Sequence, residues 1–178
     1  MKQRLFSIVL LCAMLSAVST YCTSAPTEHI PLASFTEKYV AVSIYLEQTS
    51  GGNHLLSATF TPPDGYHLYS KDIPPTGVDG LGRPTFLDLT TNSQMKATGN
   101  LVESVQAQAP DFEPKELLVY PLGAVTLSLP VELPPGADWV EDELQVTFMA
   151  CSANQCKPPV VGKVVGVRIP GADVFDHP

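Results

Sequence analysis

Hydrophobic and polar residues alternate along most of the chain after residue 25, and this period of two restricts the fold more than any other feature. Val40, Val42 and Ile44 would share one face of an extended segment, as would Leu144 and Val146. Proline pairs at 62–63, 74–75, 134–135 and 158–159 cannot lie in central strands because proline lacks the N–H donor of a ladder. The pattern predicts an all-β sandwich. We expect strands near residues 40–46, 56–60, 66–69, 85–89, 101–107, 117–120, 125–129, 144–148 and 161–169.

Two cysteines, Cys151 and Cys156, lie on either side of a four-residue polar loop with strand-like sequence on both flanks. Four residues are a common hairpin loop length. Directly opposed Cα atoms in a hairpin lie about 4.5–5.5 Å apart, which a disulfide can bridge. A disulfide across so short a loop stabilises a fold by only about 2 kcal/mol in the chain-entropy treatment. The spacing therefore leaves three readings open: a redox-active pair, a structural cystine and a thiolate metal site.

Residues 148–159 resemble the active-site hairpin of the N-terminal periplasmic domain of the DsbD family of thiol:disulfide interchange proteins. That hairpin has an aromatic-rich strand, a cysteine, a short loop, a second cysteine, one residue and two prolines; here the last part reads CKPP. Residues 64–71, DGYHLYSK, resemble a second strand of the family, and residues 120–131 match more weakly. The loop between the cysteines is one residue shorter than in the best-known version of the family.

The resemblance implies an immunoglobulin-like β-sandwich that acts as a protein-disulfide reductase or as a component of thiol-disulfide exchange, with no cofactor. Cys151 and Cys156 would carry reducing equivalents, and Tyr66 and Tyr69 would shape the site. The implied partners are a membrane-embedded dithiol electron donor and thioredoxin-like periplasmic proteins, as in cytochrome c biogenesis. DsbD proper joins this domain to a membrane domain and a thioredoxin-like domain. Neither is found in this sequence, so we expect a stand-alone exported domain whose electron donor is a separate protein. The alternative is a non-catalytic immunoglobulin-like binding or assembly module with a structural hairpin disulfide.

A cap over the cysteines is a further implication of the resemblance, because the family carries a cap loop before the position of Tyr120. Here that region is residues 110–114, where Phe112 would shield the pair and Asp111 and Glu113 would tune it. A carboxylate beside a thiol disfavours the thiolate, so these neighbours would keep the reduced pair less reactive. An ordinary proline-bounded turn is the alternative.

The two cysteines differ in their sequence surroundings. Cys156 precedes Lys157, whose ammonium would favour a nearby thiolate, and Pro158, which prevents regular strand pairing. Cys151 ends a strand patterned for the interior. We therefore expect Cys156 to meet the partner and Cys151 to resolve the mixed disulfide.

The first residues have the pattern of a secretory signal peptide: Lys2 and Arg4 precede an apolar run at 5–18, and a small-residue cleavage site ends at residue 19. We expect a signal peptide at residues 1–19, with cleavage no later than residue 25, and a periplasmic location. The mature chain would consist of a domain at 26–170 and a frayed tail at 171–178. A lipid anchor on Cys22 is the alternative. Loss of the two basic residues moves the net charge from −8 to −10, which argues against a nucleic-acid partner.

Other chemistry has little support in the sequence. The four histidines, His29, His54, His67 and His177, lack the spacing of metal ligands, and we expect them on the surface. Residues 80–82, GLG, are a fragment of a phosphate loop and predict only a turn. Met149 is a soft donor beside Cys151, but we expect it to be a packing residue on the solvent-side parity of its strand. No metal or cofactor is expected.

Overall fold

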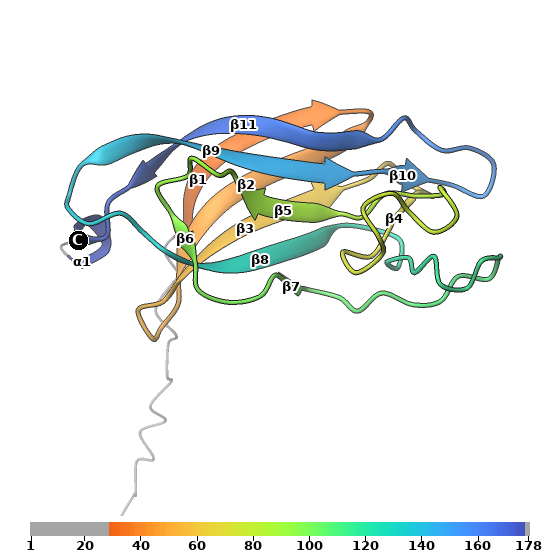
Figure 1. The fold of residues 1–178 in the computed structure, drawn as a ribbon, viewed down its shortest axis with the longest axis horizontal. Helices are drawn as coiled ribbons and strands as arrows, with labels where there is room; N and C mark the ends of the chain where they lie inside the picture. Colours follow the sequence, from red (N-terminus) through yellow and green to blue (C-terminus); the bar gives the residue numbers. More distant parts are fainter. Residues whose placement is uncertain (1–28, 177–178) are drawn as a thin grey trace, which may run out of the picture.

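The computed structural model describes residues 29–176, in which two antiparallel sheets face each other across a hydrophobic core (Figure 1). One sheet has the order β1 (His29–Glu37), β2 (Val40–Gln48), β3 (His54–Thr61), β8 (Val125–Glu132) and β6 (Lys96–Ala97), with β7 (Val102–Glu103) also paired to β8. The other has the order β11 (Val160–Pro170), β9 (Trp139–Phe148) and β5 (Phe86–Leu89). A small third sheet pairs β10 (Ala150–Cys151) with β4 (His67–Leu68), and one helical turn, α1 (Asp173–Asp176), follows β11. The predicted all-β sandwich is confirmed.

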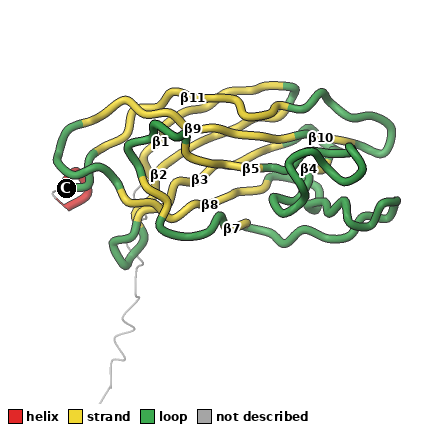
Figure 2. Tube along the Cα trace, viewed as in Figure 1, coloured by secondary structure: helices red, strands yellow, loops and turns green. Residues whose placement is uncertain are grey.

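The alternation in the sequence becomes the two faces of each sheet. Val42 and Ile44 of β2 and Leu144 and Val146 of β9 are at most 1% exposed, and they pack into one core between the sheets. Burial of a side chain of this kind stabilises a fold by about 1.5–3 kcal/mol. The four proline pairs all lie in loops, as predicted; loops occupy most of one end of the molecule (Figure 2).

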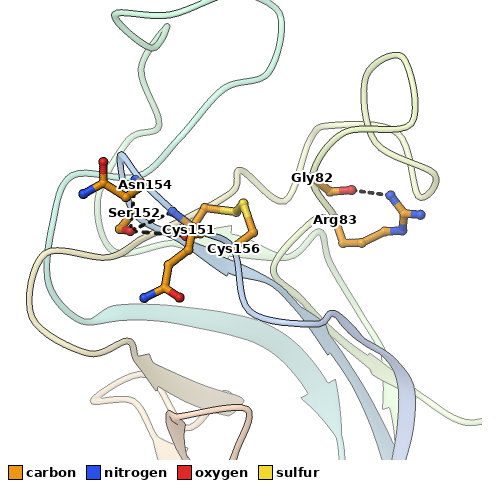
Figure 3. Close-up of a disulfide and its surroundings, with 7 residues drawn as sticks. Gly82, Arg83, Cys151, Ser152, Asn154 and Cys156 are labelled. Atoms are coloured by element: carbon orange, nitrogen blue, oxygen red, sulfur yellow. Dashed lines mark hydrogen bonds between the residues drawn. A yellow bond between two sulfur atoms is a disulfide. The ribbon is translucent and has the colours of Figure 1, made fainter.

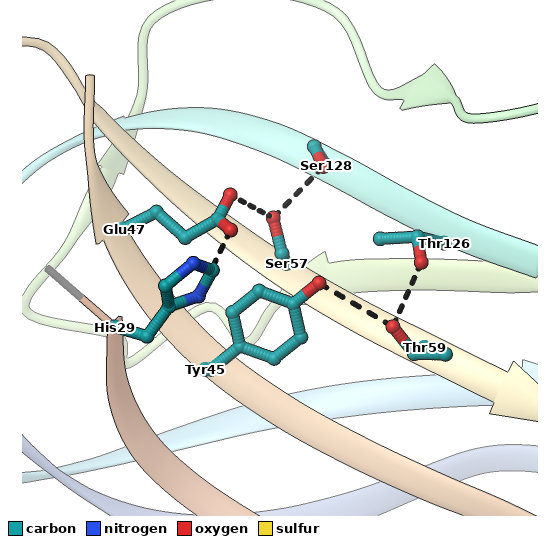
Figure 4. A network of polar contacts seen from close by, with 7 residues as sticks. All are labelled: His29, Tyr45, Glu47, Ser57, Thr59, Thr126 and Ser128. Atoms are coloured by element: carbon teal, nitrogen blue, oxygen red, sulfur yellow. Dashed lines mark hydrogen bonds and ion pairs between the residues drawn. The ribbon is translucent and has the colours of Figure 1, made fainter. Parts of the chain in front are cut away.

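The outer face of the larger sheet carries a polar network (Figure 4). The hydroxyl of Ser57, which is fully buried, lies 2.8 Å from that of Ser128, and the Thr59 and Thr126 hydroxyls lie 2.7 Å apart on the same strand pair. The network also includes His29, Tyr45 and Glu47. Cross-strand hydroxyl pairs stabilise one register, because a slip by one residue would turn these groups into the core.

The structure differs from several of the expected strands; of the expected strand 101–107, only Val102–Glu103 forms one. Residues 117–120 do not form a strand; Val119 makes only isolated bridges, to Tyr69 and Gln108. Strand β1 was not expected, and a register shift between Pro31 and Ala33 explains why it lacks a clean period of two.

Strand β11 contains an additional residue at its start, so Val161 does not share the buried face of Val165, although a regular strand over the predicted range 161–169 would place both on one face. Val160 pairs with Phe148 and Lys163 with Val146, and three residues on β11 therefore span two on β9. Val160 is buried, whereas Val161 is 62% exposed. This is a β-bulge, which shifts the side chains before it to the opposite face.

Residues 171–173, which follow β11, pack against the β8–β9 loop. The Gly171 N–H donates to the Asp138 carbonyl and the Ala172 N–H to the Pro134 carbonyl, both at 2.9 Å. Residues 171–173 are therefore held by backbone hydrogen bonds, whereas residues 177 and 178 of the predicted frayed tail lie outside the described residues. The predicted signal peptide and Cys22 lie outside the described residues. No helix within residues 29–176 has the length and apolar character needed to cross a membrane.

Candidate functional site

Cys151 and Cys156 form a disulfide at the loop-rich end of the sandwich, with their Cα atoms 4.0 Å apart (Figure 3). They bridge as antiparallel partners, which confirms the predicted hairpin. The turn between them is organised by Ser152: its N–H donates to the Gln155 carbonyl at 2.8 Å, and its hydroxyl accepts from the N–H groups of Asn154 and Gln155 at 3.3 Å. The turn is thus formed by local hydrogen bonds in addition to the disulfide.

The two cysteines differ in exposure. Cys151 is 2% exposed and belongs to a small apolar cluster with Tyr69, Ile73 and Leu117, separate from the main core. Cys156 is exposed. The difference follows from the strands, because Cys151 lies in β10, paired with β4, whereas the segment after Cys156 contains the proline pair and joins no strand until Val160.

A pocket of about 580 Å³ opens beside the disulfide. It brings together residues predicted for the site and residues that were not; the lining includes Cys151, Cys156, Tyr69, Phe112, Leu81 and Met149. Met149 is half-buried and packs beside Cys151, so its predicted packing role is confirmed.

The predicted cap loop borders this pocket. Phe112 and Glu113 line it, whereas Asp111 lines a neighbouring cavity. Phe112 is 42% exposed. The Lys115 ammonium donates to the Pro110 carbonyl at 3.0 Å and lies 3.8 Å from the Glu113 carboxylate, so it links the two ends of the loop.

His67 is a residue of this site that the sequence did not reveal, and its predicted surface position is wrong because it is half-buried. It is half-buried in β4 directly opposite Cys151 and lines the same pocket. Its ring stacks on Phe112 with centroids 6.0 Å apart and meets Tyr69 edge-on at 5.3 Å. The only sequence signal for this part of the site is the resemblance of residues 64–71 to the family, and that resemblance indicates Tyr66 and Tyr69 instead of His67.

A compact loop also lines the pocket; two of its residues, Gly82 and Arg83, are drawn with the disulfide in Figure 3. Val78 and Leu81 pair across a two-residue turn in which Asp79 and Gly80 both have positive φ, at 50° and 81°. The Arg83 guanidinium donates to three carbonyls of this loop, those of residues 76, 80 and 82. The sequence predicted a turn here but gave no sign that it borders the cysteines.

Lys157 and Tyr66 lie together on another side of the hairpin. The Lys157 ammonium lies 4.4 Å from the ring centroid of Tyr39 and 5.1 Å from that of Tyr66. Contacts with aromatic faces stabilise an ammonium at exposed sites by about 0.5–1 kcal/mol, and Lys157 is half-buried. Neither Tyr66, Lys157 nor Pro158 lines the pocket, although Pro159 does. The predicted influence of Lys157 on the Cys156 thiolate remains a prediction.

Tyr120 holds β4 in place beside the hairpin. Its N–H donates to the Leu68 carbonyl at 2.9 Å, and its hydroxyl accepts from the Lys71 N–H at 3.1 Å and donates to the Glu103 carboxylate at 2.7 Å. Burial, together with the Glu103 carboxylate, raises the pKa of Tyr120 far above its usual value of 10.0, so the hydroxyl stays protonated and keeps donating. The strand that carries His67 and Tyr69 is therefore fixed from behind.

Within residues 29–176, no three His, Cys, Asp or Glu side chains are grouped so as to hold a metal ion. The family model described as "Thiol:disulfide interchange protein DsbD, N-terminal" matches residues 36–165. The match spans both cysteines and every residue that lines the pocket. No curated protein and no solved structure matches the chain.

Proposed function

The chain belongs to the family of DsbD N-terminal domains, and on that basis we propose that it passes reducing equivalents through Cys151 and Cys156 to thioredoxin-like partners. The family carries out thiol:disulfide interchange, and its immunoglobulin-like fold is the sandwich seen here. Membership also supports a periplasmic location. Export by a signal peptide at residues 1–19 is part of the proposal, and mass spectrometry of the mature N-terminus would distinguish it from a lipid anchor on Cys22.

The observation that carries the proposal is the unequal exposure of the two cysteines. Exchange proceeds when a thiolate attacks a disulfide sulfur and a second thiol resolves the mixed disulfide. A partner can approach Cys156, which is exposed, while Cys151, at 2% exposure, is largely shielded from a partner. In the reduced domain, the Cys156 thiolate attacks the partner disulfide. The Cys151 thiolate then attacks Cys156, and two electrons pass to the partner.

The pocket offers a place for the partner segment next to its reactive cysteine. Leu81 and Phe112 are 53% and 42% exposed at its edge, and Pro159 borders it close to Cys156. Exposed apolar side chains around a reactive group are typical of an interaction site. We propose that Phe112 and Glu113 form the cap that this segment displaces, and that a membrane-embedded dithiol donor uses the same face.

A trapping experiment tests the proposal. Cys151→Ser leaves Cys156 without a resolving thiol, so it should accumulate mixed disulfides with thioredoxin-like proteins from a periplasmic extract. Cys156→Ser is the matched control and should trap little. Non-reducing gels and mass spectrometry identify the trapped proteins. Equal trapping by both variants would refute the division of roles, and no trapping by either would refute the exchange function.

The alternative of a structural cystine makes a different prediction in cells. A pair that is supplied with electrons is partly reduced even in an oxidising compartment, whereas a structural disulfide stays oxidised. Rapid acid quenching followed by an alkylating mass tag measures the reduced fraction of the Cys151–Cys156 pair. A pair found fully oxidised under all growth conditions would favour the binding or assembly module.

A further inference from the structure

His67 stands directly across from the less accessible cysteine. Residues that oppose each other in an antiparallel pair point to the same face, with Cβ atoms about 4.5–5.5 Å apart. His67 and Cys151 are such a pair, and both line the pocket beside the disulfide. Rings on either side fix the imidazole: Phe112 stacks on it and Tyr69 meets it edge-on. The position is therefore defined by backbone pairing and by packing.

The imidazole also has an unused hydrogen-bonding atom. Nε2 of His67 is buried and has no hydrogen-bond partner among the described residues of this oxidised structure. Buried polar atoms nearly always have a hydrogen-bond partner, so a buried ring nitrogen without one beside a disulfide indicates a functional role. A disulfide has no proton to offer, whereas the reduced Cys151 would present an S–H to this face of the pocket.

We propose that His67 is the proton acceptor for Cys151 in the resolving step of thiol-disulfide exchange, an inference that rests on the function proposed above. After Cys156 has bonded the partner, the Cys151 S–H gives its proton to Nε2 of His67. The Cys151 sulfur attacks the Cys156 sulfur, the bond between Cys156 and the partner breaks, and the partner leaves as a thiolate. The imidazolium returns its proton to that thiolate or to water, so protons and electrons balance.

The surroundings of His67 favour a neutral imidazole. Burial lowers its pKa from the ordinary value of 6.5, so at pH 7 the ring is uncharged and able to accept a proton. The titratable or charged groups that border its two cavities are Cys151, Cys156, Tyr69, Tyr120, Asp111, Glu113 and Arg83. Burial raises the pKa of both tyrosines, so neither is charged at neutral pH. The Arg83 guanidinium is engaged by backbone carbonyls.

A two-phase reaction measures the step directly. The reduced protein, with Cys12→Ser and Cys22→Ser to remove its other thiols, is mixed in a stopped-flow instrument with one equivalent of 5,5′-dithiobis(2-nitrobenzoate). Attack by Cys156 frees the first coloured thiolate and resolution by Cys151 frees the second. His67→Phe keeps an aromatic ring between Phe112 and Tyr69 but removes the proton acceptor.

The expected effect is confined to the second phase. Without a base, the rate of resolution depends on the fraction of Cys151 that is thiolate. For a thiol of ordinary pKa near 8.5, this fraction is about 3% at pH 7. The second phase should therefore slow about 30-fold or more. Its rate should then rise about tenfold per pH unit between pH 6 and 8, whereas the unsubstituted protein should be nearly flat from about pH 6.5 upward. A purely structural role for His67 would not create this slope.

The controls separate the possible failures. His29→Phe removes an imidazole on the outer sheet face and should leave both phases unchanged; Cys151→Ser should abolish the second. If His67→Phe does not fold, as judged by circular dichroism, His67→Gln replaces it with the same expected loss. If the second phase keeps its normal rate and its flat pH profile in these variants, the proposed role of His67 is refuted but the exchange function is not. Absence of a second phase from the unsubstituted protein would overturn the exchange function as well.

Discussion

Replacement of both cysteines by alanine should leave a cooperatively folded sandwich. Cys151 packs in the small cluster with Tyr69, Ile73 and Leu117, whereas the large core between the sheets contains neither cysteine. The turn also keeps its own hydrogen bonds, including the one from the Lys157 N–H to the Ala150 carbonyl at 2.8 Å. The double variant should therefore lose a local constraint and retain the packing that folds the domain.

The size of the loss follows from the loop that the disulfide closes. The cysteines are five positions apart, and the chain-entropy relation for a loop of about six residues gives about 7 cal/mol/K, or about 2 kcal/mol at 25 °C. Removal of the buried Cys151 sulfur leaves a small gap that costs up to about 1 kcal/mol more. The free energy of unfolding should fall by about 2–3 kcal/mol in total.

Urea unfolding followed by circular dichroism measures this difference. The oxidised protein, the same protein with a reductant and the double variant should all unfold in one transition with similar slopes, because they expose similar surface. The reductant-treated protein should lie within about 1 kcal/mol of the double variant. A non-cooperative transition, or a loss well above 5 kcal/mol, would show that the disulfide holds the fold together and would refute the reasoning.

Two further substitutions test the walls of the pocket. In a background without the other thiols, Phe112→Ala should speed alkylation of the reduced pair by a small reagent, because it removes the aromatic ring beside the cysteines. The matched control is Trp139→Ala, which removes a ring of 41% exposure on another part of the surface. Equal alkylation rates in the two variants would exclude a shielding role for Phe112. Gly82→Ala should destabilise the domain by about 1–3 kcal/mol more than Gly80→Ala. Both positions have positive φ, but an added Cβ would lie 2.7 Å from a Leu117 methyl only at Gly82, and equal losses of stability would contradict that contact.

The period of two predicted most of the sandwich because the core strands obey it without interruption. It failed where the backbone departs from regular pairing. The register shift in β1 removes its alternation, and the bulge at the start of β11 shifts the parity of Val161. Such irregularities depend on the partner strand, which a single sequence does not specify.

The sequence predicted those parts of the site whose residues lie close together along the chain. Cys151 and Cys156 define their own hairpin, and their spacing predicts the pairing. His67 was missed because its burial and its partner are set by the pairing of β4 with β10, a contact between distant parts of the chain. The position of the Lys157 ammonium likewise depends on Tyr39, in the turn between β1 and β2.

The arrangement of the small third sheet would allow the proposed thiol-disulfide exchange to proceed without disturbing the fold. Strands β4 and β10 are two residues each and pair with one another, outside the two large sheets. Tyr120 fixes β4 from behind, and the four-residue turn organised by Ser152 fixes the hairpin. Opening the disulfide therefore removes a constraint from an end that other contacts already hold, which is the mechanical requirement for a domain that cycles between dithiol and disulfide.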